Sequence, residues 1–159
     1  GWPIDSSHIR NGVAHAFWPG RMQFLKGSPE ILLDGAHNRQ GIVQLVSFLR
    51  RQDTGRDRCL IFAAMRDKEV SSMLRTLCPI FSKVILTRAQ NPRSASVGEL
   101  LTMTPKSFLP RVTTADDLPQ AIRMAREYGN GDRLVVVAGS LFLVGEALTE
   151  LRFDTTQPL

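Results

Sequence analysis

Residues 30–38 read EILLDGAHN, a short apolar run that ends at Asp34 and Gly35 and leads into residues that can begin a helix. Three further runs are equally short and apolar, and turn residues bound each of them: RCLIFAAM at 58–65, SKVILTR at 82–88 and DRLVVVAGS at 132–140. Strands with a continuous apolar sequence are buried on both faces, as happens when helices cover both sides of a parallel sheet. The four runs therefore predict the centre of such a sheet.

Helical patterns fill the intervals between these strands, at residues 41–52, 69–77, 96–103, 116–128 and, after the last strand, 141–151. In the first of these segments the apolar residues recur at the spacing of one helix face. Strands that alternate with helices need crossover connections, which pack the helices against a parallel sheet. The sequence thus predicts an α/β fold with a mostly parallel, doubly wound, Rossmann-like sheet and helices on both faces.

Two shorter segments extend this sheet to about six strands. Residues 21–26 alternate in polarity and lead through Gly27, Ser28 and Pro29 into the first buried run, so they predict a hairpin with one antiparallel edge strand. Residues 108–113 are interrupted by proline and predict a loop with a brief edge strand. Because no repeat or interdomain linker is visible, residues 1–159 are expected to form a single domain, frayed at its last five residues.

Composition limits the classes of partner. The chain has 20 Lys and Arg against 15 Asp and Glu, a net charge of +5 that suits anionic ligands. The arginines are scattered and are not interleaved with aromatic residues, so no nucleic-acid partner is expected. No apolar stretch approaches the roughly 20 residues of a membrane span, and no signal peptide is visible. The two cysteines suggest neither a disulfide nor a metal site, so we expect a reduced, cytoplasmic protein. We also expect a monomer.

Polar residues follow three of the buried runs at the point where each strand ends. Asp34, His37 and Asn38 follow the first, Asn91 and Arg93 follow the third, and Ser140 follows the fourth. Ligands collect at the carboxyl ends of parallel strands, where helix N-termini add free N–H groups. An arginine fork beside a serine at a helix start suits an α-amino acid. The same residues could also be caps, turns and solvated charges, and the sequence alone leaves both interpretations open.

The chain carries no sign of a complete catalytic apparatus. His37 has no neighbouring serine or cysteine in sequence, and no G-x-S-x-G elbow occurs. With three histidines in all, no metal cluster is expected. The G-x-x-x-x-G-K-[ST] loop that cradles nucleotide triphosphates is also missing.

Five motifs, taken in order, resemble the C-terminal domain of folylpolyglutamate and dihydrofolate synthases, which belong to the Mur ligase superfamily. They are WPGR at 18–21, LDGAHN at 33–38, MRDK at 65–68, NPR at 91–93 and AGSL at 138–141. The resemblance spans roughly residues 5 to 151. The pair formed by the first two motifs favours the folate branch over the peptidoglycan ligases.

The resemblance implies that ATP phosphorylates a carboxylate of folate or dihydropteroate and that L-glutamate attacks the acyl phosphate. It places Arg21 near the nucleotide phosphates, Asp34 at the ribose, and His37, Asn91, Arg93 and Ser140 around the glutamate, with Arg21 and His37 as catalytic residues. ATP and Mg²⁺ are expected to bind mainly to an N-terminal ATPase domain that this chain lacks, across a shared interdomain cleft. The chain by itself is therefore expected to be inactive.

Three alternative classes remain. The chain could be the C-terminal domain of another Mur-type ligase, or a non-catalytic α/β module that binds a ligand. A Rossmann-type nucleotide-binding protein is disfavoured because no G-x-G-x-x-G follows the first buried run.

Overall fold

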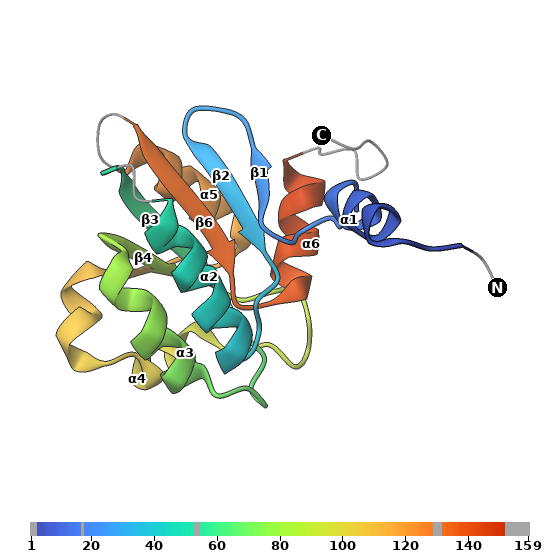
Figure 1. The fold of residues 1–159 in the computed structure, drawn as a ribbon. Coiled ribbons are helices and arrows are strands. Elements are labelled where there is room, and N and C mark those ends of the chain that lie inside the picture. Colours follow the sequence, from blue (N-terminus) through green and yellow to red (C-terminus); the bar gives the residue numbers. More distant parts are fainter. Residues whose placement is uncertain (1–2, 17, 53–54, 129–131, 152–159) are drawn as a thin grey trace.

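A computed structural model of the chain describes residues 3–16, 18–52, 55–128 and 132–151. Its strands form one sheet in the order β1-β2-β6-β3-β4-β5 (Figure 1). Their bounds are β1 (Gln23–Leu25), β2 (Glu30–Asp34), β3 (Asp57–Phe62), β4 (Lys83–Leu86), β5 (Val112–Thr114) and β6 (Arg133–Ala138). β1 is antiparallel to β2, and the other paired strands are parallel. The mostly parallel six-stranded sheet with one antiparallel edge strand is confirmed.

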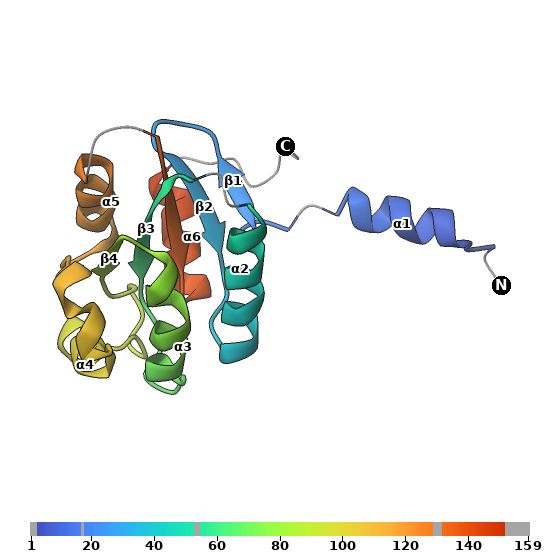
Figure 2. The same ribbon diagram turned by 60° about the vertical axis from the view of Figure 1, so that its left-hand side comes forward.

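Helices cover both faces of the sheet, as the apolar runs predict. One face carries α2 (Arg39–Arg51), α3 (Val70–Leu77) and α4 (Val97–Met103), and the other carries α5 (Leu118–Glu127) and α6 (Leu141–Glu150) (Figure 2). Every residue of β6 is buried, and neighbouring residues of that strand belong to the two different core clusters. Burial on both faces explains why these strands read as continuous apolar runs.

The strand that comes last in the chain lies at the centre of the sheet. Asp34 of β2 and Phe62 of β3 both pair with Ala138 of β6. The carboxyl ends of β2, β6, β3 and β4 therefore follow one another along a single edge of the sheet. The polar residues that come directly after these strands are delivered to that edge.

Some local elements differ from the sequence-based expectation. The segment before β5 contains a 3₁₀ helix, η2 (Lys106–Arg111), and a second one, η1 (Cys78–Ile80), extends α3. Near the N-terminus, α1 (Ser6–Ala14) forms without any apolar-periodicity signal, contains no buried residue and projects from the rest of the domain (Figure 2). The expected fraying of residues 155–159 concerns residues outside those described. Within the described ranges, no helix has the length and apolarity needed to cross a membrane.

Candidate functional site

The turn between β2 and α2 presents His37 and caps the helix that follows. Asn38 is the N-cap of α2, because its Oδ1 accepts the backbone N–H of Gly41 (2.8 Å). Nδ1 of His37 lies 2.8 Å from the carbonyl oxygen of Gly35. A carbonyl can only accept, so Nδ1 carries the proton and Nε2 of the neutral ring keeps its lone pair. The turn therefore holds the imidazole in one tautomer, with Nε2 as a proton acceptor.

The turn between β6 and α6 lies beside the first turn and carries Ser140. The backbone N–H of Gly139 donates to the carbonyl oxygen of Ala36 (2.9 Å), which joins the two turns. Oγ of Ser140 accepts the N–H groups of Phe142 (3.1 Å) and Leu143 (3.4 Å), so Ser140 caps α6. Its hydroxyl hydrogen is not used by these two bonds and can donate to an acceptor oxygen.

The loop after β4 is clamped to the loop after β3, which brings Arg93 to the same edge. The backbone N–H of Arg66 donates to the carbonyl oxygen of Arg93 (2.9 Å). Nη2 of Arg93 lies 3.1 and 3.2 Å from the two carboxylate oxygens of Asp67, and Nζ of Lys68 lies 3.0 Å from Oδ2 of Asp67. Hydrogen bonds from Lys68 and Arg93 lower the pKa of Asp67. Asp67 thus holds two cations side by side.

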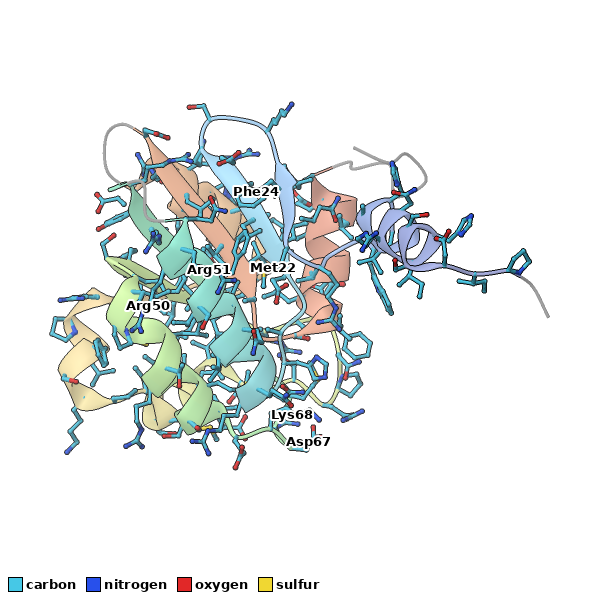
Figure 3. The ribbon with its side chains drawn as sticks, in the orientation of Figure 1. Met22, Phe24, Arg50, Arg51, Asp67 and Lys68 are labelled. Atoms are coloured by element: carbon cyan, nitrogen blue, oxygen red, sulfur yellow. The ribbon has the colours of Figure 1, made fainter. Side chains whose placement is uncertain are left out.

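Figure 3 shows Asp67 and Lys68 at the end of the domain where α2 begins, whereas Arg50 and Arg51 mark the other end of that helix. The cation pair therefore belongs to the edge formed by the carboxyl ends of the strands. The arginines at the C-terminal end of α2 lie away from it.

A cavity of about 170 Å³ gathers the side chains of these loops. It is lined by His37, Met65, Lys68, Arg93, Ser140, Leu141 and Phe142. Three of the residues proposed for an amino-acid pocket, namely His37, Arg93 and Ser140, therefore meet in one cavity. Asn91 does not line it; its Oδ1 accepts the backbone N–H of Arg93 (2.9 Å) and shapes the turn that presents that arginine.

Lys68 lines the cavity, although the sequence analysis assigns it no role. The MRDK motif was recognised, but a lysine in a polar loop after a strand is usually a solvated charge. Lys68 lies in the loop after β3, at the edge of the sheet that the other motifs share. That position is the signal that could have identified it. The sequence analysis also missed Leu141 and Phe142, which are 47% and 50% exposed. Apolar residues at the start of a helix give no sign in the sequence that they stay exposed.

Arg21 and Asp34 lie next to this cavity and do not line it. The backbone N–H of Gly35 donates to the carbonyl oxygen of Gly20 (2.8 Å), so the WPGR loop lies along the β2–α2 turn. A Cβ atom on Gly35 would lie 3.4 Å from Nη1 of Arg21, which places the exposed guanidinium beside that glycine. Asp34 is 4% exposed, and its two oxygens accept the N–H groups of Ala36 (2.9 Å) and Met22 (3.0 Å).

Metal-ligating and nucleophilic side chains do not gather at this edge in the described parts of the chain. No group of three or more His, Cys, Asp or Glu side chains comes together among those residues. Cys59 and Cys78 are buried in the core, and burial raises their pKa to about 12 and about 11. Both thiols are therefore protonated at neutral pH and unsuited to nucleophilic attack.

Comparison with known proteins shows the family of the chain. The family model described as "Mur ligase, glutamate ligase domain" matches residues 20–141. A probable bifunctional folylpolyglutamate synthase/dihydropteroate synthase of Haloferax volcanii is 33% identical over 146 residues, which cover 92% of this chain and 17% of that protein. The chain therefore spans a small part of this relative.

Two solved structures share the fold. The folylpolyglutamate synthase of Mycobacterium tuberculosis complexed with ADP superposes with a TM-score of 0.88 at 29% identity, covering 96% of this chain and 36% of that one. The bifunctional folylpolyglutamate synthase/dihydrofolate synthase of Yersinia pestis, with Mn, AMPPNP and L-glutamate bound, gives a TM-score of 0.81 at 26% identity, covering 95% and 36%. Because the family model covers more than half of its residues, the chain belongs to the glutamate ligase domain family of the Mur ligases.

Proposed function

We propose that this chain is the glutamate-binding part of an ATP-dependent ligase that adds L-glutamate to folate or dihydropteroate. The observation that carries the proposal is the cavity that joins His37, Lys68, Arg93 and Ser140 at the carboxyl edge of the sheet. L-glutamate has two carboxylates and one amine. The cavity offers two cations, a hydroxyl donor and a nitrogen lone pair, which match those three groups.

Each side chain has a role that follows from its bonds. Lys68 and Arg93 are proposed to bind the two carboxylates of glutamate, because ammonium and guanidinium groups form strong, charge-assisted hydrogen bonds. The hydroxyl of Ser140 would donate to one of those oxygens at the N-terminus of α6, where the helix favours negative charge. Asn91 would act through the turn that presents Arg93.

His37 is proposed to receive a proton during amide formation. When the amine of glutamate attacks an acyl phosphate, the new C–N bond forms, the C–O bond to phosphate breaks, and the attacking nitrogen loses a proton. Nε2 of His37 has the lone pair to accept it, because Nδ1 is committed to the carbonyl oxygen of Gly35. The imidazolium would then keep its bond to that carbonyl.

ATP and Mg²⁺ are proposed to bind mainly to a domain that precedes this one, because the family resemblance assigns the P-loop and magnesium ligands to that domain. From this chain, Arg21 fits the nucleotide phosphates, since an exposed guanidinium can stabilise the charge that develops during phosphoryl transfer. The folate or dihydropteroate would lie in the cleft between the two domains. Cys59 and Cys78 are free and buried, which suits a reducing compartment, so we propose a cytoplasmic enzyme. We also propose that the enzyme is a monomer.

The test uses the ligase that contains this chain. Lys68→Met and Arg93→Met should each raise the KM for L-glutamate by about 10- to 100-fold, as expected for losing a hydrogen bond to a charged group. Arg21→Ala should instead lower kcat with little change in the glutamate KM. Arg88→Met is the matched control, because Arg88 is an exposed arginine in the loop after β4 that does not line the cavity.

Unchanged glutamate kinetics in both cavity variants would refute the pocket assignment. Glutamate binding without any ligation by the complete protein would instead identify a non-catalytic module. A preference for another amino acid would identify another Mur-type ligase.

A further inference from the structure

α1 (Ser6–Ala14) is a short helix that stands apart from the rest of the domain. None of its nine residues is buried. The hydrogen bonds of the helix and its caps connect residues 5–16 with one another, and Figure 2 shows α1 away from the sheet and its covering helices. Isolated helices shorter than about 12–15 residues are marginal in water, and packing of an apolar face stabilises most helices in proteins. α1 therefore needs a partner surface.

The apolar side chains of α1 are exposed on one side of the helix. Ile9 and Val13 are four residues apart, which puts them on the same face, and they are 59% and 73% exposed. Ile4 directly precedes the N-cap and is 69% exposed; a residue at that position commonly packs against the fourth helical residue, here Ile9. A hollow of about 480 Å³ is lined by Pro3, Ile4, His8 and Ile9.

Exposed apolar side chains are concentrated in this part of the chain. Among the described residues, eight large apolar side chains are exposed, and four of them belong to residues 4–18. The face of α1 opposite Ile9 and Val13 carries Ser7 and Asn11. Apolar side chains that gather on one exposed face, with polar residues around them, indicate an interaction surface.

α1 lies outside the glutamate ligase domain but within the part of the chain that a longer relative shares. The segment that matches the family model begins at residue 20, after α1. The folylpolyglutamate synthase structure of Mycobacterium tuberculosis covers 96% of this chain, and the unmatched remainder is shorter than the nine residues of α1, so the match reaches into this helix. This chain spans 36% of that longer structure. The remainder of such a protein can supply the surface that α1 needs.

We propose that the apolar face of α1, formed by Ile4, Ile9 and Val13, docks on the ATPase domain that precedes this chain in the complete ligase. The inference rests on the proposed function, which places ATP and Mg²⁺ mainly in that domain. A surface joined to α1 by a short stretch of chain is met at an effective concentration in about the millimolar range, so a small apolar contact is sufficient. A second copy of the chain would be met only at its much lower free concentration.

Docking of α1 would also keep Arg21 within reach of the ATPase domain. Arg21 follows Ala14, the last residue of α1, by seven positions. An extended chain spans at most about 3.6 Å per residue, so Arg21 lies within about 25 Å of the end of the docked helix. Gly20 holds the other end of this connection, because its carbonyl oxygen accepts the N–H of Gly35 (2.8 Å). The arginine proposed for the nucleotide phosphates is thus tied to both domains.

Hydrogen exchange of the α1 amides tests the docking and does not depend on ligase activity. In this chain alone the amides should exchange quickly, because no residue of the helix is buried. In the complete ligase they should exchange at least about 100-fold more slowly, since each aliphatic side chain that leaves water contributes a factor of about 10 or more. Equal exchange rates in the chain alone and in the complete ligase would overturn the proposal.

Two variants and a matched control identify the face that docks. In the complete ligase, Val13→Asp places a charge on the docking face and should remove most of the protection, whereas Asn11→Asp places the same charge on the opposite face and should leave the protection unchanged. Ile9→Ala combined with Val13→Ala should remove it as well, although alanine is the better helix former, so lost helix propensity cannot explain the result. Protection that survives both docking-face variants, or that Asn11→Asp removes equally, would overturn the assignment of this face.

Sedimentation of this chain alone tests the other occupant. The chain should be monomeric at micromolar concentration, and a dimer that Val13→Asp dissociates would identify a second copy as the partner and overturn the proposal. If the complete protein that contains this chain proves unable to ligate glutamate, the proposed function fails, and the exchange of the α1 amides still decides whether the helix docks.

Discussion

Replacing Gly139 by alanine should destabilise the domain severely, because the structure leaves no room for a side chain there. Gly139 has a φ of 102°, and a Cβ atom would lie 2.3 Å from the carbonyl oxygen of Ala63 and 2.5 Å from Cε2 of Phe62. The backbone conformation costs about 1–3 kcal/mol for a non-glycine residue. Overpacking costs about 1–3 kcal/mol more, and its upper end applies because a backbone carbonyl cannot rotate away.

The sum is about 4–6 kcal/mol, a large share of the roughly 5–15 kcal/mol that stabilises a domain. For a chain of this length each kcal/mol moves the melting temperature by about 2–4 °C, so Gly139→Ala should melt about 10 °C or more below wild type. Thermal unfolding followed by circular dichroism measures this directly. Gly98→Ala in α4 is the control, because a Cβ there meets no atom within 4 Å. A Gly139→Ala variant that melts within about 2 °C of this control would refute the reasoning.

Three further predictions concern caps, thiols and pH. Asn38→Ala removes the N-cap of α2 and should lower the stability of the domain by about 1 kcal/mol, or its melting temperature by about 2–4 °C. Asn38→Asp keeps a capping oxygen and should melt like wild type. Equal melting temperatures for the two variants would contradict the cap. Cys59 and Cys78, buried and with raised pKa, should not react with a thiol reagent in the native protein at pH 8 but should react in urea, and rapid native labelling would contradict their burial. Bonds from the backbone and side chain of Ser96 lower the pKa of Glu99, so its stabilisation is present above its ordinary pKa and is lost as the pH falls through the lower folded value. The melting-temperature gap between wild type and Glu99→Gln should therefore narrow from about pH 5 to pH 3, and a constant gap would contradict this.

Strand identity was predictable from the sequence, and strand order was not. The apolar runs mark β2, β3, β4 and β6 because each is buried on both faces, a local property of the sequence. The insertion of β6 between β2 and β3 depends on how the crossover helices pack, which no local pattern records. The edge strands β1 and β5 were foreseen from alternation and from a proline-bounded segment. The sequence analysis missed α1 because this helix has no apolar face in contact with the core. Only a capping box between Asp5 and His8 marks its start.

The candidate site divides in the same way. His37, Arg93 and Ser140 were predicted to meet because each follows a parallel strand, and they line one cavity. Lys68 was missed because its place depends on Asp67, which also binds Arg93 from a loop 26 residues away. An ion pair between two loops is a property of the folded chain. The sequence names the loops that meet at the edge, and the folded chain decides which charges become neighbours.

Gly35 joins the two halves of the proposed site through its two backbone polar groups. Its N–H binds the carbonyl oxygen of Gly20 and so fixes the loop of Arg21, while its carbonyl oxygen binds Nδ1 of His37 and so fixes the ring that faces the cavity. A side chain at this position would come within 2.3 Å of Cδ2 of Leu141, at the start of the helix that Ser140 caps. One residue without a side chain therefore touches the loop proposed to act on phosphate, the histidine proposed to accept the amine proton and the helix that borders the glutamate cavity. The proposed amide formation requires the phosphorylated carboxylate and the amine to meet, and Gly35 binds both groups of residues through its N–H and its carbonyl oxygen, which holds them in fixed relation within this domain.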